Sequence, residues 1–195
     1  DLFLRFFHLV FPNRPIGYSE YGAEGMPNLH SRRPRRGDHT EEYQARYHEY
    51  MVRCFARFPW LWATHVWNMF DFGAAHRTEG DRPGINDKGL VTHDRKIKKD
   101  AYYFYRANWN PEPMIYIAGR RNVNRVKPLV DVQVFSNVEE VILIVNDCQC
   151  GKMKPDSLKV CLFKDVPLRK GRNEIEVRAN DSKKQLIDRC AWILQ

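Results

Sequence analysis

Apolar and polar positions follow different patterns in the two halves of the chain. In residues 1–112, helical stretches alternate with strand-like ones, and the breaks between them are rich in proline, glycine or charge. The pattern predicts helices over 2–11, 38–58 and 99–109 and strands over 16–20 and 62–72. Helices alternating with strands are typical of a parallel sheet, and two strands are too few to build a covered one. This half therefore resembles a slice of a larger α/β domain.

The helix over 38–58 carries the clearest local signals. Its apolar and aromatic residues recur three or four positions apart, which places them on one helical face. Asp38 and Glu41 have the spacing of a capping box, so Asp38 is the predicted N-cap. The stretch 62–72 that follows is bulky and β-prone, and we expect a strand buried on both faces. In a barrel, the loops after such strands build the active site.

Residues 113–195 are predicted to form strand after strand. Apolar and polar residues alternate most clearly over 130–134 and 175–177. The expected strands span 114–118, 130–136, 140–145, 158–166, 173–178 and 186–194. Turn signals such as Asn146-Asp147 separate them. Short strands with regularly spaced turns favour a β-sandwich.

Composition narrows the class of protein. Hydrophobic residues make up 43% of the chain and aromatic residues 13%, which excludes a disordered chain. No apolar run reaches the ~18 residues that a membrane span needs, so we expect no membrane partner. The apolar start over 2–11 also lacks the basic region and cleavage site of a signal peptide.

The formal net charge is +8 and is spread along the chain. Its densest basic patch is Arg32, Arg33, Arg35 and Arg36. We interpret this patch as a solvated loop, because no nucleic-acid motif or aromatic stacking platform accompanies it. No nucleic-acid partner is therefore expected, although salt-sensitive binding to DNA would support that weaker alternative.

The five cysteines are interpreted as ordinary thiols. Their odd number argues against a complete disulfide framework. Cys148 and Cys150 would need two more converging ligands to hold zinc, and no second pair with suitable spacing follows. We expect no metal site and no cofactor in this chain.

Polar and aromatic residues near the strand ends are the candidates for chemistry. Glu20 ends a predicted strand, where an unpaired buried carboxylate would be costly unless it had a partner or a function. Trp67 could form a flat apolar floor for a sugar ring or could be a core residue. Asn86 and Lys88 could hold sugar hydroxyls or a carboxylate, or could belong to a turn.

Five blocks of sequence together resemble the C-terminal end of a family 2 glycoside hydrolase. These are SEYGAEG at 19–25, TEEYQARYHEYM at 40–51, VWNMFDF at 66–72, NDKGLVTHDRKIKKDAYYFYRANW at 86–109 and IAGRRNVNR at 117–125. Their order and spacing make chance agreement very improbable, and the resemblance covers essentially the whole chain. It is strongest to the β-galactosidases of gut-type Bacteroides bacteria.

This resemblance implies an α/β plus all-β architecture. Residues 1–112 would be the C-terminal portion of a (β/α)8 TIM barrel, with strand 7 over 16–20 and strand 8 over 63–71. Residues 113–195 would be the immunoglobulin-like β-sandwich that follows the barrel. The remainder of the barrel would then be a partner of this chain, and a homo-oligomer is left open. The family also favours a periplasmic or secreted bacterial protein.

The resemblance also implies roles for the candidate residues. Family members hydrolyse β-glycosides with retention through two carboxylates. Glu20 matches the nucleophile, whereas the acid/base Glu belongs to a region outside this chain. Tyr21 and Trp67 would bind substrate, with Trp67 at the floor of the sugar site. Asn86 and Lys88 match the Asn-x-Lys pair that grips the carboxylate in related β-glucuronidases.

Three functions remain open at this point. The resemblance ranks a β-galactosidase acting on terminal β-galactosides first, and a β-glucuronidase of the same family is the alternative because of Lys88. The chain alone is expected to be inactive, since it carries one of the two carboxylates. A non-catalytic sandwich or packing module is the third possibility, and it would not need Glu20 at a strand end.

Overall fold

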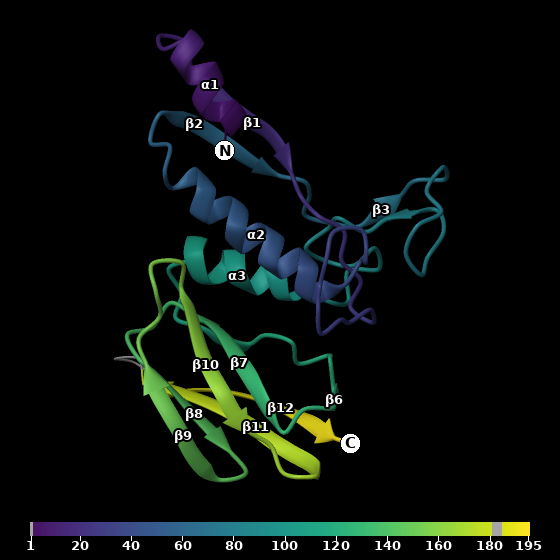
Figure 1. Ribbon diagram of the computed structural model, residues 1–195, viewed down its shortest axis with the longest axis vertical. Helices are drawn as coiled ribbons and strands as arrows, with labels where there is room; N and C mark the ends of the chain where they lie inside the picture. The colour runs from purple at the N-terminus through teal and green to yellow at the C-terminus, as the bar shows by residue number, and fades with distance from the viewer. Residues whose placement is uncertain (1, 181–184) are drawn as a thin grey trace. The chain divides into compact units, whose positions relative to one another are not determined.

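A computed structural model describes residues 2–180 and 185–195 of the chain (Figure 1). The chain divides into two compact units, which we call unit 1 (Asp1–Ile97) and unit 2 (Lys98–Gln195). The helix predicted over 99–109 therefore belongs to unit 2. The predicted domains, 1–112 and 113–195, stay a prediction.

Unit 1 contains one parallel β–α–β arrangement preceded by a helix (Figure 1). Its main elements are α1 (Leu2–Val10), β1 (Ile16–Tyr21), α2 (Glu41–Phe55) and β2 (Leu61–Val66). Strands β1 and β2 pair in parallel, as the alternating pattern predicts. The eight-stranded barrel that the resemblance implies remains a proposal for the complete enzyme.

Helix α2 begins two residues later than the capping-box spacing predicts. Thr40 is the N-cap, and its hydroxyl accepts a hydrogen bond from the Tyr43 amide at 3.3 Å. Asp38 instead accepts from the Thr40 amide at 3.0 Å and from its hydroxyl at 2.8 Å. The prediction of Asp38 as N-cap is therefore wrong, because its carboxylate folds onto the true cap residue. These hydrogen bonds hold the pKa of Asp38 below its ordinary value although burial opposes them.

The strand predicted over 62–72 is shorter than expected and is not buried on both faces. Strand β2 ends at Val66, and the Trp62 side chain is 69% exposed. In the part of the chain that the structure describes, β1 and β2 form a two-stranded sheet, so one flank of each strand has no neighbouring strand. A small hairpin of β3 (Phe72–Gly73) and β4 (Ile85–Asn86) follows. Its strands were not predicted because each spans only two residues.

Unit 2 is a sandwich of two sheets preceded by α3 (Asp100–Trp109). One sheet has the order β10-β7-β5 and the other the order β6-β12-β11-β8-β9. The strands are β5 (Ile115–Ile117), β6 (Asn124–Arg125), β7 (Leu129–Ser136), β8 (Val141–Val145), β9 (Cys148–Met153), β10 (Val160–Pro167), β11 (Gly171–Asn180) and β12 (Gln185–Leu194). All six predicted strands are present, and the sandwich prediction is confirmed for this unit.

The core of unit 2 forms where alternate residues of the two sheets meet. Val132 and Val134 from β7 are fully buried, as are Ile175 and Val177 from β11. Trp192 of β12 completes this cluster, with the Arg125 guanidinium 3.8 Å above its ring. The alternation that predicted the strands is thus the alternation that fills the core.

Strand β9 was missed by the sequence analysis although its turn was recognised. Asn146 and Asp147 both have positive φ, 49° and 66°, which matches the turn that joins tightly paired antiparallel strands. Strand β9 then pairs with β8. Its sequence, CQCGKM, contains no β-branched or aromatic residue and so gives no strand signal.

None of the described helices is both long and apolar enough to span a membrane. The four arginines of the basic patch, Arg32, Arg33, Arg35 and Arg36, are all exposed in the loop before α2.

Candidate active site

The end of β1 presents two neighbouring side chains to different surroundings. Glu20 is exposed, whereas Tyr21 is only 3% exposed. The Tyr21 ring packs edge-on against Phe55 of α2, with ring centres 4.9 Å apart. The Tyr18 ring, two residues before Glu20, also packs against Phe55 at 5.2 Å, and the pairing of β1 with β2 is irregular between Tyr18 and Tyr21. Alternation therefore does not assign a face to Glu20, but the exposure of its side chain leaves the carboxylate within reach of a bound molecule.

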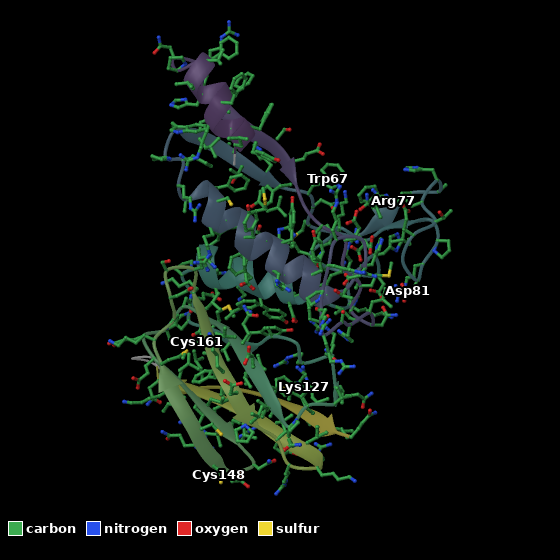
Figure 2. The ribbon with its side chains drawn as sticks, in the orientation of Figure 1. Trp67, Arg77, Asp81, Lys127, Cys148 and Cys161 are labelled. Atoms are coloured by element: carbon green, nitrogen blue, oxygen red, sulfur yellow. The ribbon has the colours of Figure 1, made fainter. Side chains whose placement is uncertain are left out.

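Trp67 follows β2 directly and touches the end of β1. Its amide donates a hydrogen bond to the Tyr21 carbonyl at 2.8 Å. Gly22 allows this approach, because a Cβ at that position would lie 1.8 Å from the Trp67 carbonyl oxygen. The indole is 37% exposed and meets the Phe72 ring edge-on at 5.9 Å. The structure thus brings the segment after Glu20 and a partly open indole together (Figure 2).

The loop with Asn86 and Lys88 runs beside Trp67. The Asn68 amide donates to the Lys88 carbonyl at 3.3 Å, and the Leu90 amide donates to the Asn68 carbonyl at 3.0 Å. Asn86 is 6% exposed, and its Oδ1 accepts from the Lys88 amide at 3.1 Å. Asn86 therefore shapes the turn, and its contact with substrate stays a prediction. Lys88 Nζ lies 3.4 Å from Glu24 Oε1, and its side chain is 26% exposed.

Gln44 and Asp71 hold this loop in place and were not predicted. Gln44, fully buried on α2, donates from Nε2 to the Ala23 carbonyl at 3.0 Å and to the Gly89 carbonyl at 3.1 Å. Asp71 Oδ1 accepts from the Gly89 amide at 2.9 Å. A polar residue on the inner face of a predicted amphipathic helix was the one sequence signal for Gln44.

A buried pair of side chains fixes the middle of the same loop. His39 Nδ1 lies 2.7 Å from Asp87 Oδ2, and the Asp87 carbonyl accepts from the Gly25 amide at 3.1 Å. Asp87 is 1% exposed and His39 is 8% exposed. Buried polar groups held in this way give a loop one defined conformation. Sequence separation of 48 residues hid the pair from the sequence analysis.

The described residues contain no group of three His, Cys, Asp or Glu side chains arranged to hold a metal ion. Each of the five cysteines lies among the described residues and is a free thiol. What unit 1 does offer is an exposed carboxylate, a partly exposed indole and a partly exposed ammonium, carried by segments tied through their backbones. These groups suit binding and cleavage of a polar ring-shaped substrate.

No family model matches the chain. Among curated proteins, a β-glucuronidase of Bacteroides fragilis is 48% identical over 188 residues, which cover 93% of this chain and 27% of that protein. A β-glucuronidase of Streptococcus agalactiae is 37% identical over 92 residues, covering 46% of this chain. The chain therefore spans about a quarter of the length of the first of these relatives.

Solved structures of β-glucuronidases are also similar to this chain, over its whole length. An FMN-binding β-glucuronidase from Faecalibacterium prausnitzii L2-6 has a TM-score of 0.90 and 43% identity, with 100% of this chain and 29% of that chain covered. A Bacteroides uniformis β-glucuronidase 2, covalently bound to cyclophellitol-6-carboxylate aziridine, has a TM-score of 0.87 and 32% identity, with 100% and 24% covered. A Bacteroides fragilis structure named as a β-galactosidase has a TM-score of 0.93 and 29% identity, with 100% and 30% covered.

These comparisons do not favour the β-galactosidase branch that the sequence ranked first. The relatives with the higher sequence identities carry the name β-glucuronidase, and the β-galactosidase neighbour is matched at 29% identity. The chain is therefore similar, over nearly its whole length, to one region of several β-glucuronidases and of one structure named as a β-galactosidase.

Proposed function

We propose that this chain is part of a retaining exo-β-glycosidase in which Glu20 is the nucleophile. Glu20 would attack the anomeric carbon of a terminal sugar and form a covalent glycosyl-enzyme intermediate. A second carboxyl group, supplied by the remainder of the barrel, would protonate the leaving oxygen and then activate water. In retaining enzymes the two groups lie about 5–5.5 Å apart. The exposure of Glu20 at the end of β1 supports this role.

The substrate class that we favour is a terminal β-glucuronide. The observation that carries this choice is the ammonium of Lys88, partly exposed on a loop that hydrogen-bonds to the residue after Trp67. A cation on a loop beside Trp67 suits a sugar that carries a carboxylate, since charged hydrogen bonds are stronger than neutral ones. The names of the relatives point the same way. A β-galactosidase is the second candidate, favoured by the high structural similarity to the Bacteroides fragilis neighbour.

The remaining residues would orient the sugar rather than react. The exposed edge of the Trp67 indole would pack against the apolar C–H face of the ring. Asn86 accepts a hydrogen bond from the Lys88 amide and would thereby hold the loop in one position relative to the Trp67 indole. Positioning of this kind lowers the entropic cost of reaching the transition state.

The test compares two substrates on the full-length protein that contains this chain. We expect hydrolysis of an aryl β-glucuronide well above that of the matching aryl β-galactoside. The variant Glu20→Gln should lose at least about a thousandfold in kcat, because an amide is a poor nucleophile. Covalent labelling by cyclophellitol-6-carboxylate aziridine should also disappear in this variant.

Three outcomes would contradict parts of the proposal. Preference for the galactoside would restore the first ranking and remove the carboxylate-reading role of Lys88. Unchanged turnover by Glu20→Gln would exclude Glu20 as the nucleophile. Turnover by the 195-residue chain alone would show that the second carboxylate lies within it.

A further inference from the structure

Three charged side chains of unit 1 form a cluster that the proposed mechanism uses only in part. Lys88 Nζ lies 3.4 Å from Glu24 Oε1, and Arg77 Nη1 lies 3.6 Å from the same oxygen. We call Glu24, Arg77 and Lys88 the Glu24 cluster. Their side chains are between 21% and 26% exposed, so the cluster is sheltered but open to solvent. Figure 2 labels Arg77 among the loops that also carry Trp67.

Each member of the cluster sits on a segment with a fixed backbone. The Gly25 amide donates to the Asp87 carbonyl at 3.1 Å, which places Glu24 beside the Lys88 loop. Arg77 lies in the connection between β3 and β4, where its carbonyl accepts from the Gly84 amide at 2.7 Å. The same connection is tied to the loop before α2 by a hydrogen bond from Asn28 to Asp81. The cluster is therefore built by three loops rather than by one flexible side chain.

The charges within the cluster do not balance. Two cations share one carboxylate oxygen of Glu24, so these three side chains keep a net charge of +1. Glu79 also attracts Arg77 electrostatically, but its side chain is exposed, so water screens this attraction. Both separations are longer than the roughly 2.7–2.9 Å of a strong charge-assisted hydrogen bond, and hence neither cation is tightly held by Glu24. At partial burial, the electrostatic attraction between a second anion and two such cations is stronger than it would be in water. The arrangement suits an added carboxylate.

We propose that Arg77 is a second specificity-determining cation of the acid-reading site and that Glu24 is the positioning residue for both cations. The inference rests on the proposed function, because it requires Lys88 to read a carboxylate of the substrate. Glu24 would hold the two like charges near each other in the empty site. The substrate carboxylate would then be met by both Arg77 and Lys88.

The test measures KM and kcat of the full-length enzyme on an aryl β-glucuronide and on the matching β-galactoside. We expect Arg77→Gln to raise KM for the glucuronide by about tenfold, the equivalent of one charged hydrogen bond, and to leave kcat and the galactoside KM nearly unchanged. Arg77→Lys should recover part of the loss because it keeps the charge. Arg36→Gln, which removes an exposed arginine of the same unit, is the matched control and should change neither substrate.

The positioning role of Glu24 is tested by measuring KM and kcat on the same two substrates. Glu24→Gln should raise the glucuronide KM without a comparable change for the galactoside, and Glu24→Asp should partly reverse this. An effect of Arg77→Gln on both substrates alike, or on neither, would overturn the proposal. If Lys88→Gln also fails to discriminate between the substrates, the proposed function fails; if Lys88→Gln discriminates and Arg77→Gln does not, this inference alone is wrong.

Discussion

At the scale of single residues, neighbouring side chains of β1 differ sharply in exposure. Glu20 is exposed, while the Tyr21 ring is buried against α2. Tyr21 was predicted to bind substrate, and in this structure its contribution to the site is its carbonyl, which receives the Trp67 amide. Its substrate contact stays a prediction. The buried Tyr21 ring anchors the strand end, so the exposed Glu20 beside it is carried by a backbone with a defined position.

The buried thiol of Cys161 and the partly buried thiol of Cys190 are expected to make the stability of unit 2 depend on pH. Burial raises the pKa of Cys161 and of Cys190 to about 12, from an ordinary value of 9.0. Above pH 9 the unfolded chain releases these protons while the folded chain keeps them, so stability falls as the pH rises from about 9 towards 12. Thermal unfolding of the chain between pH 8 and pH 10.5 should show this loss.

The thiol explanation has its own control. The double variant Cys161→Ala/Cys190→Ala should start from a lower stability but lose less of it over the same pH range, since the groups that titrate are gone. An equal slope in both proteins would assign the pH dependence to other groups. Iodoacetamide at pH 8 should modify the exposed Cys148 and Cys150 before Cys161 or Cys190.

At the scale of elements, close backbone contacts decide where the site loop lies. A Cβ at Gly89 would lie 2.1 Å from the Asp71 amide nitrogen and 2.3 Å from the Phe70 carbonyl carbon. Both are backbone atoms, which cannot move aside as the end of a side chain can. The loop that carries Asn86 and Lys88 thus depends on the absence of a single methyl group.

Gly89→Ala should therefore displace this loop and weaken substrate binding. In the full-length enzyme we expect the glucuronide KM to rise by about tenfold or more, since small misplacements of positioning groups are costly. Gly73→Ala is the matched control, because a Cβ there meets nothing within 4 Å. Equal kinetics for the two variants would show that the loop position does not set affinity.

The burial of each element decides whether it could be predicted from the sequence. Strands with alternating apolar residues, such as β7 and β11, were found because burial in a sandwich imposes that alternation. Strand β9 and the small β3–β4 hairpin carry no such pattern. Glu20, Trp67 and Lys88 were found through their motifs, whereas Gln44 acts through contacts between distant segments, which no local pattern reports.

At the scale of the whole molecule, the two units differ in how much apolar surface they cover. The described part of unit 1 leaves large side chains of α1 open, with Leu2 83%, Leu9 79% and Phe3 71% exposed. Trp62 on β2 is 69% exposed as well. Open apolar faces and open strand edges invite pairing with another polypeptide segment. In the proposed enzyme, the remainder of the barrel would cover them.

This difference predicts unequal protection against hydrogen exchange in the chain on its own. In dilute monomer, amides of β1 and β2 should exchange much faster than those of β7, β8 and β11, which belong to the covered sandwich. Unit 2 serves as the internal reference in the same sample. Strong protection of residues 15–72 under these conditions would show that unit 1 is stable without further segments.

Because of Gln44, exchanging the recognition loop alone between related proteins is not expected to exchange their substrate preference. Gln44 sits on α2 yet donates hydrogen bonds to the carbonyls of two different site loops, at Ala23 and Gly89. Replacing residues 86–90 by those of a galactoside-specific relative would introduce new substrate-contacting residues. The helix residue that holds the loop would still be the original Gln44. A successful graft would need position 44 and the donor loop to be exchanged as one module.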